Sequence, residues 1–170
     1  LLNNIPIEIE NIRINKINIG LYSNEISFLK FIDQITNGTK IYISQTGTHL
    51  KFIPGTITNN YGKEFLFEFD SSRGLSYYIE GFIPIVIFGK EKLLCKISGA
   101  TNNNLDLSLD CFKPNLFYLL EKIVVGDNFS IDIIKRSFSP DNTSEVKLNL
   151  PIIRFIEPLD LRFKSKDNKV

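Results

Sequence analysis

The residues of this chain that could do chemistry are few and scattered. His49 is the only histidine, and it lies in a strand-like stretch on the side opposite to Leu50 and Phe52, which favours an exposed position over a nucleophilic one. Cys95 falls in a strand-like segment and Cys111 in a helix-like one, so we expect two reduced, buried thiols. Neither a Cys/His zinc spacing nor a glycine-rich phosphate loop is present. We therefore predict no catalytic residue, no metal and no cofactor.

The acidic residues have explanations in local structure. Asp106 and Asp110 lie four positions apart at the start of a helix-like segment. There Asp106 would cap the helix and Asp110 would favour its positive end. Glu64, Glu68 and Asp70 alternate with phenylalanines, which is typical of a solvated strand face.

Basic residues are the candidates for contact with RNA or with a protein partner. The chain has a formal net charge of +1 and a charged fraction of 23 %, so attraction to nucleic acid must come from a local patch or from a bound partner. The C-terminal run of positive charges would make such binding salt-dependent, and the alternative is an ordinary solvated surface. The candidates are Arg73 before a helix, Lys135 and Arg136 at a strand end, and Arg162, Lys164 and Lys166 in the C-terminal run.

Hydrophobic periodicity predicts two related blocks of helices and strands. In the first, Phe28, Phe31, Ile32 and Ile35 recur at helical spacing. They predict a helix near 24–37, capped by Ser23 or Asn24 and ended by Gly38, between a strand at 5–12 and a hairpin that reaches 53. The second block reads strand, helix, strand, helix, strand, strand, at 65–69, 73–88, 93–98, 107–124, 129–135 and 145–150. Phe112 lies on the apolar stripe of the second helix, and Pro84 and Pro114 should each kink a helix or begin it.

These blocks predict an α/β fold of two layers, built from βαβαββ repeats with helices on one face of a mixed sheet. Residues 1–58 would be a partial first repeat of order βαββ, lacking its first strand and helix. Residues 59–151 would be a complete second repeat, and 152–170 a basic C-terminal segment. The chain contains no methionine, so we expect a segment or a processed product, and no apolar run is long enough for a membrane span.

A series of short segments extends over nearly the whole chain: NEISFL (24–29), ITNG (35–38), QTGT (45–48), PG (54–55), RGLSYYIE (73–80), GATNN (99–103), KR (135–136), EV (145–146) and PLDL (158–161). In order and spacing these segments resemble the RNA 3′-terminal phosphate cyclase-like proteins, the non-catalytic nucleolar branch of the RNA 3′-phosphate cyclase family. That resemblance implies βαβαββ repeats like those of the enolpyruvate transferases and of the C-terminal domain of bacterial translation initiation factor three. It also implies that a further repeat and an inserted domain follow this chain.

The resemblance also bears on catalysis. A cyclase of this family transfers AMP through an adenylated histidine that the resemblance places beyond Val170, so this segment alone should be inert as a cyclase. Relatives carry a run of glycines after the position of Arg136, whereas this chain has SFSPDNTS at 137–144. Side chains at these positions make a phosphate-binding nest of backbone amides less favourable. Arg73 and Gly74 would lie near the active-site cleft of the superfamily.

The function that the resemblance implies is ribosome biogenesis in the nucleolus, within the small-subunit processome. Such a protein would act in 18S rRNA maturation together with a ribosome-assembly GTPase and the U3 small nucleolar ribonucleoprotein, with pre-rRNA as a further partner and no membrane. The alternative is an ATP-dependent RNA 3′-terminal phosphate cyclase of which this chain is a fragment lacking the catalytic histidine. A small-molecule enolpyruvate transferase is disfavoured, because the basic residues are too scattered for its cleft.

Overall fold

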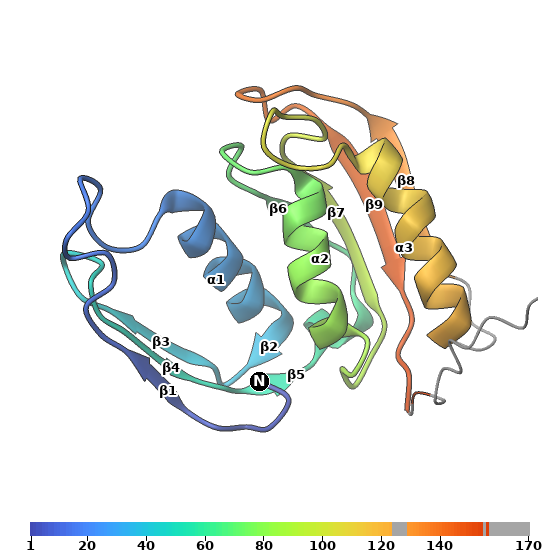
Figure 1. The fold of residues 1–170 in the computed structure, drawn as a ribbon. Helices are drawn as coiled ribbons and strands as arrows, with labels where there is room; N and C mark the ends of the chain where they lie inside the picture. Colours follow the sequence, from blue (N-terminus) through green and yellow to red (C-terminus); the bar gives the residue numbers. More distant parts are fainter. Residues whose placement is uncertain (124–128, 155, 157–170) are drawn as a thin grey trace, which may run out of the picture.

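The computed structural model describes residues 1–123, 129–154 and 156, with side chains of the third helix described as far as residue 120. This part is a mixed α/β structure, in agreement with the predicted class (Figure 1). None of its helices is long and apolar enough to cross a membrane. In chain order its elements are β1 (Ile7–Ile9), α1 (Ser23–Ile35), β2 (Thr36–Asn37), β3 (Lys40–Ile43), β4 (Leu50–Ile53), β5 (Thr56–Ile57), the 3-10 turn η1 (Asn59–Gly62), β6 (Phe65–Glu68), α2 (Leu75–Val86), β7 (Leu93–Ser98), α3 (Leu109–Ile123), β8 (Ser130–Lys135) and β9 (Glu145–Leu150).

The first block consists of α1 and an antiparallel sheet of order β1-β4-β3. Alternation of apolar and polar residues sets the register, which pairs Ile7 and Ile41 with Phe52 from either side. A separate pair, β2 with β5, follows the end of α1. Helix α1 has Tyr22 as its N-cap residue and ends at Ile35, so the predicted capping by Ser23 or Asn24 and the predicted end at Gly38 are wrong.

Gly38 instead serves the tight turn between β2 and β3, with a φ of +82°, a left-handed conformation that side chains disfavour.

The second block is a mixed four-stranded sheet of order β6-β7-β9-β8, with α2 and α3 side by side on one face (Figure 1). Strands β6 and β7 are parallel, as expected for two strands joined through a helix, and the other pairings are antiparallel. Both predicted helices form within two residues of their expected bounds. Each runs through its proline, with Pro84 in the last turn of α2 and Pro114 inside α3, so neither helix begins there.

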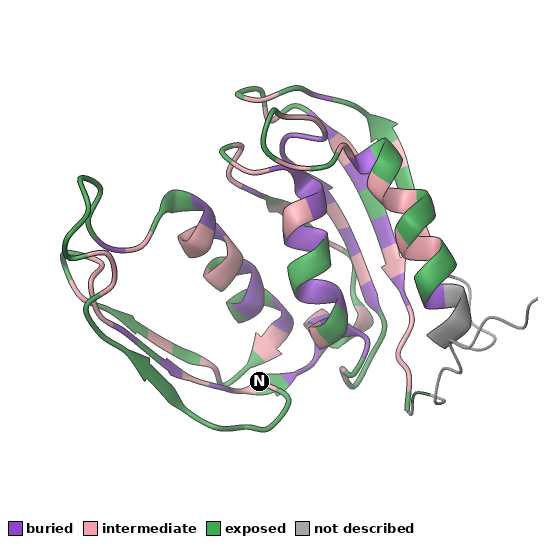
Figure 2. Cartoon of the chain, in the orientation of Figure 1, coloured by how far each residue is buried: buried purple, intermediate pink, exposed green. Residues whose placement is uncertain are grey.

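The core lies between the helices and the sheet, and it continues from one block into the other (Figure 2). Phe31 of α1 is fully buried, and its ring centroid lies 4.5 Å from that of Phe82 in α2 and 5.1 Å from that of Phe69 after β6. Phe28 packs over Gly81 of α2, where a Cβ atom would lie only 3.0 Å from the ring. Aromatic contacts of this kind, together with the burial of apolar surface, stabilise the docking of α1 on the second block.

Two rings are less buried than their stripes predict. Phe28 and Phe112 are only half-buried and pack against the edge of the core, whereas Phe31, Ile32 and Ile35 are buried as expected. A helical stripe identifies the side of a helix that faces the core, but its outer members remain exposed where no further element covers them.

Candidate functional site

The polar residues that could bind a ligand gather at one edge of the four-stranded sheet. Strands β6, β7 and β8 all point toward this edge, because β8 and β7 both run antiparallel to β9. Helices α2 and α3 begin there, as Figure 1 shows at the top of the second block. Ligands of open α/β sheets bind outside the carboxyl ends of strands, so this is the natural place for a site. We call the segments 70–74, 99–110 and 135–144 the loop edge.

Arg73 is held at the centre of the loop edge by Asp106. Its Nε donates to both carboxylate oxygens of Asp106 at 3.0 Å, and its Nη2 donates to Oδ1 at 2.5 Å. The guanidinium carbon also lies 3.8 Å from the centre of the Tyr77 ring, a cation–π stack. About a third of the Arg73 side chain stays exposed, although its Nε and Nη2 already donate to Asp106.

Asp106 does more than pair with Arg73. Its carboxylate also accepts hydrogen bonds from the backbone amide of Gly74 at 2.7 Å and from Nδ2 of Asn103 at 2.9 Å. Partial burial alone would raise the pKa of this carboxyl group, but these hydrogen bonds and the guanidinium charge outweigh burial and lower the pKa to about 2. Asp106 therefore stays ionised and ties the loop after β7 to the start of α2.

The prediction that Asp106 caps α3 is wrong. Ser108 occupies that position, and its carbonyl and hydroxyl oxygens accept from the backbone amide of Cys111 at 3.1 and 3.3 Å. Asp110 does lie in the first turn of α3, as predicted, where its charge favours the positive end of the helix. The sequence could not separate these roles, because serine and aspartate cap helices about equally well.

Arg136 is held in the same way by Asp110. Its Nε and Nη2 donate to the two carboxylate oxygens at 2.9 and 2.7 Å, and both side chains are exposed. The pair with Arg136 lowers the pKa of Asp110. Lys135 ends β8 as an exposed side chain and has no ion pair within the part of the chain described. The predicted contact residues Arg73, Lys135 and Arg136 thus share one edge of the sheet, while Arg162, Lys164 and Lys166 lie outside the described residues.

The loop at 137–144, where a glycine-rich nest was judged unfavourable, is fixed by hydroxyl groups. The hydroxyls of Ser137 and Ser144 both donate to the carbonyl oxygen of Gly99 at 2.6 Å. The Thr101 hydroxyl donates to the carbonyl oxygen of Ser137 at 2.8 Å, and the Gly99 amide donates to the Ser144 hydroxyl at 3.1 Å. These buried hydrogen bonds hold the loop against the end of β7. They also satisfy the polar groups of the loop and of the strand end that face each other.

The loop edge as a whole is not positively charged. Its four acidic side chains, Asp70, Asp106, Asp110 and Asp141, outnumber the three basic ones, Arg73, Lys135 and Arg136. A surface that binds nucleic acid through its own field has an excess of positive charge, which is the electrostatic term that dominates phosphate binding. At the loop edge, in contrast, both arginines are neutralised by a carboxylate at hydrogen-bond distance.

Three further predictions can be compared with the structure. Cys95 is buried, and burial raises its pKa, whereas Cys111 is exposed on α3, so the expectation of two buried thiols is half wrong. Glu64 and Glu68 lie exposed on the sheet, as predicted. Asp70 is less exposed than its predicted strand-face position implies. Burial there would raise the pKa of Asp70, but hydrogen bonds from Ser72 help to lower it.

Sequence reasoning missed one cluster. His49 was predicted to be exposed, and it is only partly so: its ring lies against Glu8 of β1 and Glu10 just after that strand. No sequence signal links these residues, because strand pairing brings together positions about 40 residues apart.

The fold and this edge define an α/β protein whose sheet presents a charge-compensated loop surface. The profile of the family described as RNA 3′-terminal phosphate cyclase matches residues 1–161. The chain belongs to this family.

Its similarity to the cyclase-like branch, expected from short segments, is confirmed by individual relatives. A probable RNA 3′-terminal phosphate cyclase-like protein of Dictyostelium discoideum is 34 % identical over 164 residues, 96 % of this chain and 44 % of the relative. The human RNA 3′-terminal phosphate cyclase-like protein is 32 % identical over 166 residues, 97 % of this chain and 44 % of the relative. The rRNA processing protein rcl1 of Schizosaccharomyces pombe is 29 % identical over 154 residues, 90 % of this chain and 42 % of the relative. The chain thus spans less than half the length of these relatives.

Proposed function

We propose that this chain is part of a ribosome-biogenesis factor that acts in 18S rRNA maturation, within the small-subunit processome, without cyclase activity. The name of the fission yeast relative, an rRNA processing protein, supports the process. The observation that carries the proposal is that both arginines of the loop edge are engaged with Asp106 and Asp110.

Phosphoryl and adenylyl transfer depend on donors that are free to meet phosphate oxygens as charge develops on them. At this edge Nε and Nη2 of Arg73 already donate to Asp106, which carries a full negative charge beside them. A phosphate that displaced Asp106 from Arg73 would leave the largely buried charge of Asp106 without a counter-ion, at a cost of several kcal/mol. The loop edge therefore suits a surface of fixed shape for assembly better than a cradle for a reacting phosphate.

The partners in this proposal come from the family resemblance. They are a ribosome-assembly GTPase and the U3 small nucleolar ribonucleoprotein, met in the nucleolus, with pre-rRNA as a further contact. Lys135, Arg136 and the exposed part of Arg73 would meet RNA phosphates, together with the basic C-terminal residues Arg162, Lys164 and Lys166.

The architecture in this proposal is a partial first repeat at 1–58, a complete βαβαββ repeat at 59–151 and a basic C-terminal segment, in a fold shared with the enolpyruvate transferases. The order of elements from β6 to β9 supports that division.

The test uses the full-length protein in two assays. Incubation with radiolabelled ATP should give no covalent AMP adduct, with a known RNA 3′-phosphate cyclase as the positive control. Depletion of the protein from cells should reduce mature 18S rRNA and leave the large-subunit rRNAs in place, and re-expression should restore it. A labelled adduct together with conversion of an RNA 3′-phosphate to a cyclic end would establish the cyclase alternative instead. Normal 18S rRNA after depletion would refute the role in ribosome biogenesis.

A further inference from the structure

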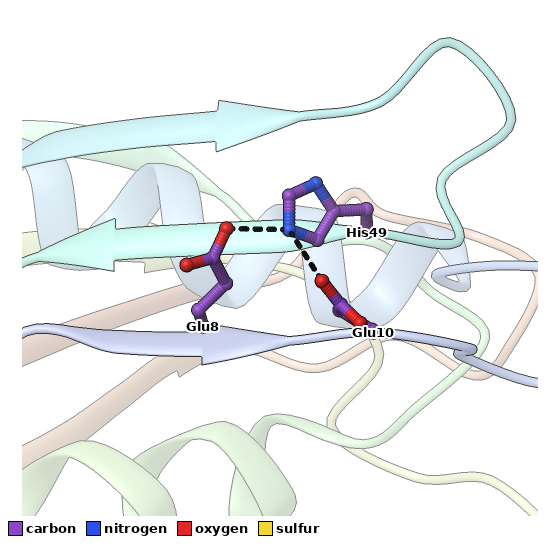
Figure 3. Close-up of side chains that lie close together, drawn as sticks. All are labelled: Glu8, Glu10 and His49. Carbon is purple, nitrogen blue, oxygen red and sulfur yellow. Dashed lines mark hydrogen bonds and ion pairs between the residues drawn. The ribbon is translucent and has the colours of Figure 1, made fainter.

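A second cluster of titratable groups lies far from the loop edge, on the outer face of the first sheet. Figure 3 shows the side chains of Glu8, Glu10 and His49 pointing toward one another. Nε2 of His49 lies 2.8 Å from Oε1 of Glu8 and 4.0 Å from Oε1 of Glu10. The three ligand atoms all lie within 4.8 Å of one another. The cluster thus offers one imidazole nitrogen and two carboxylate oxygens to a single point.

The backbone holds these side chains in place. Leu50 of β4 pairs with Ile9 of β1, which puts His49 opposite Glu10 and diagonal to Glu8. Beyond this position the amide of Ile12 donates to the carbonyl oxygen of Thr48 at 3.0 Å, one residue out of the β1–β4 register, so the two segments stay hydrogen-bonded to each other. Glu8 lies in β1 and Glu10 directly follows the last residue of that strand, and both side chains point toward His49 (Figure 3). The β1–β4 ladder on one side of His49 and this hydrogen bond on the other therefore hold the two segments together at the cluster.

We propose that Glu8, Glu10 and His49 form a binding site for a divalent transition-metal ion of the Zn²⁺ class. An imidazole nitrogen with carboxylates is a ligand set for zinc and its neighbours, and three protein ligands leave a coordination position open. In a tetrahedral site with metal–ligand bonds of about 2.0–2.1 Å, two ligand atoms lie about 3.3 Å apart. The observed separations of 2.8 and 4.0 Å lie on either side of that value. These two separations need to change by less than 1 Å, and that between the two carboxylate oxygens, which is at most 4.8 Å, by no more than about 1.5 Å. Side-chain torsions can supply such shifts.

The charges around the cluster agree with a cation of this class. The two carboxylates repel one another, and a divalent ion would remove that repulsion. Lys51 lies opposite Glu8 in the strand pairing and on the same face. Its positive charge opposes the binding of any cation, so an ion attracted by charge alone should bind weakly here. Mg²⁺ prefers six oxygen ligands in octahedral geometry and is poorly served by an imidazole, so the site should discriminate against it.

The exposure of the three side chains makes the site testable without disturbing the core. The side chains of His49, Glu8 and Glu10 are 40 %, 49 % and 70 % exposed, so an ion can reach them and substitutions should leave the fold intact. His49→Gln and Glu10→Gln each remove one ligand. Glu64→Gln is the matched control, because Glu64 is an exposed carboxylate of the other block that pairs with Lys147.

The experiment is a titration of the full-length protein with ZnCl2 by calorimetry, repeated with excess MgCl2. The wild type and Glu64→Gln should bind one Zn²⁺ ion with equal affinity, and excess Mg²⁺ should not displace it. His49→Gln and Glu10→Gln should each bind that ion at least about tenfold more weakly, because even residues that only orient metal ligands are worth about 10- to 100-fold. Equal Zn²⁺ affinity in His49→Gln and the wild type would overturn the proposal. So would displacement by Mg²⁺, which would mean that the carboxylates attract cations only by charge.

Discussion

Asp106→Asn should measurably destabilise the protein, because Asp106 joins three parts of the loop edge. Its side chain is 8 % exposed and accepts hydrogen bonds from Arg73, Gly74 and Asn103. A pKa lowered from 3.8 to about 2 corresponds, at about 1.4 kcal/mol per pKa unit, to roughly 2.5 kcal/mol of stabilisation by the ionised form. Solvent screening near the exposed part of Arg73 reduces this, so we expect a loss of about 1–2 kcal/mol in the free energy of unfolding at pH 7. Urea denaturation measures it.

The pH dependence gives this prediction its sharper form. Because the pKa of Asp106 is lower in the folded state, its stabilisation is complete above about pH 4 and is lost as the pH falls toward 2. The difference between wild type and Asp106→Asn should therefore shrink over that interval. Asp110→Asn is the control: its pair with Arg136 is exposed on both sides, and exposed pairs contribute little. Equal effects of the two substitutions at pH 7, or a difference that stays constant down to pH 2, would refute the role assigned to Asp106.

Four other substitutions test burial and packing. Phe31→Ala should cost about 3–5 kcal/mol of unfolding free energy in urea, and Phe28→Ala clearly less, because only Phe31 is fully buried; equal losses would contradict the docking of α1 through Phe31. In the native protein a thiol reagent should modify Cys111 and spare buried Cys95, so Cys111→Ser should remove the fast-reacting thiol of this segment, and an unchanged reaction would place Cys95 at the surface. Gly55→Ala should lower the thermal midpoint, since a Cβ would come within 2.3 Å of a backbone oxygen, and an unchanged midpoint would contradict that close approach.

The helices and strands of this fold were predictable because their signals are local. The stripe through Phe31, Ile32 and Ile35 faces the core, and the strands near β6, β7, β8 and β9 lie within a residue of their predicted bounds. What the sequence could not give is how far each stripe is covered, since that depends on the packing of distant elements. Phe28, Phe112 and Cys111 are more exposed than expected for this reason. Helix ends were wrong by a residue or more where several polar residues competed for one cap, as at Tyr22.

The candidate site was predictable only in part. The sequence identified Arg73 and Arg136 as basic residues near element ends. They reach one edge of the sheet because β6 and β8, the strands that precede them, run in the same direction. It did not reveal that Asp106 and Asp110 lie within hydrogen-bond distance of them, 33 and 26 residues away along the chain. These pairings reverse the electrostatic interpretation of the edge. The sequence leaves RNA contact and an ordinary solvated surface both open, whereas in the structure Nε and Nη2 of each arginine already donate to a carboxylate.

An arginine beside a helix start recurs in the two blocks and indicates what these pairs do. Arg13 lies 3.9 Å from the centre of the ring of Tyr22, the N-cap residue of α1, and donates to Glu25 in its first turn at 2.8 Å. Arg73 stacks on Tyr77 in the first turn of α2 and donates to Asp106. Arginine suits both places, because its planar group can stack on a ring while its edge binds a carboxylate with two parallel hydrogen bonds, which lysine cannot do. The shared geometry means that both arginines fix the angle at which the chain enters a helix, so any contact of Arg73 with RNA must use the third of its side chain that this role leaves exposed.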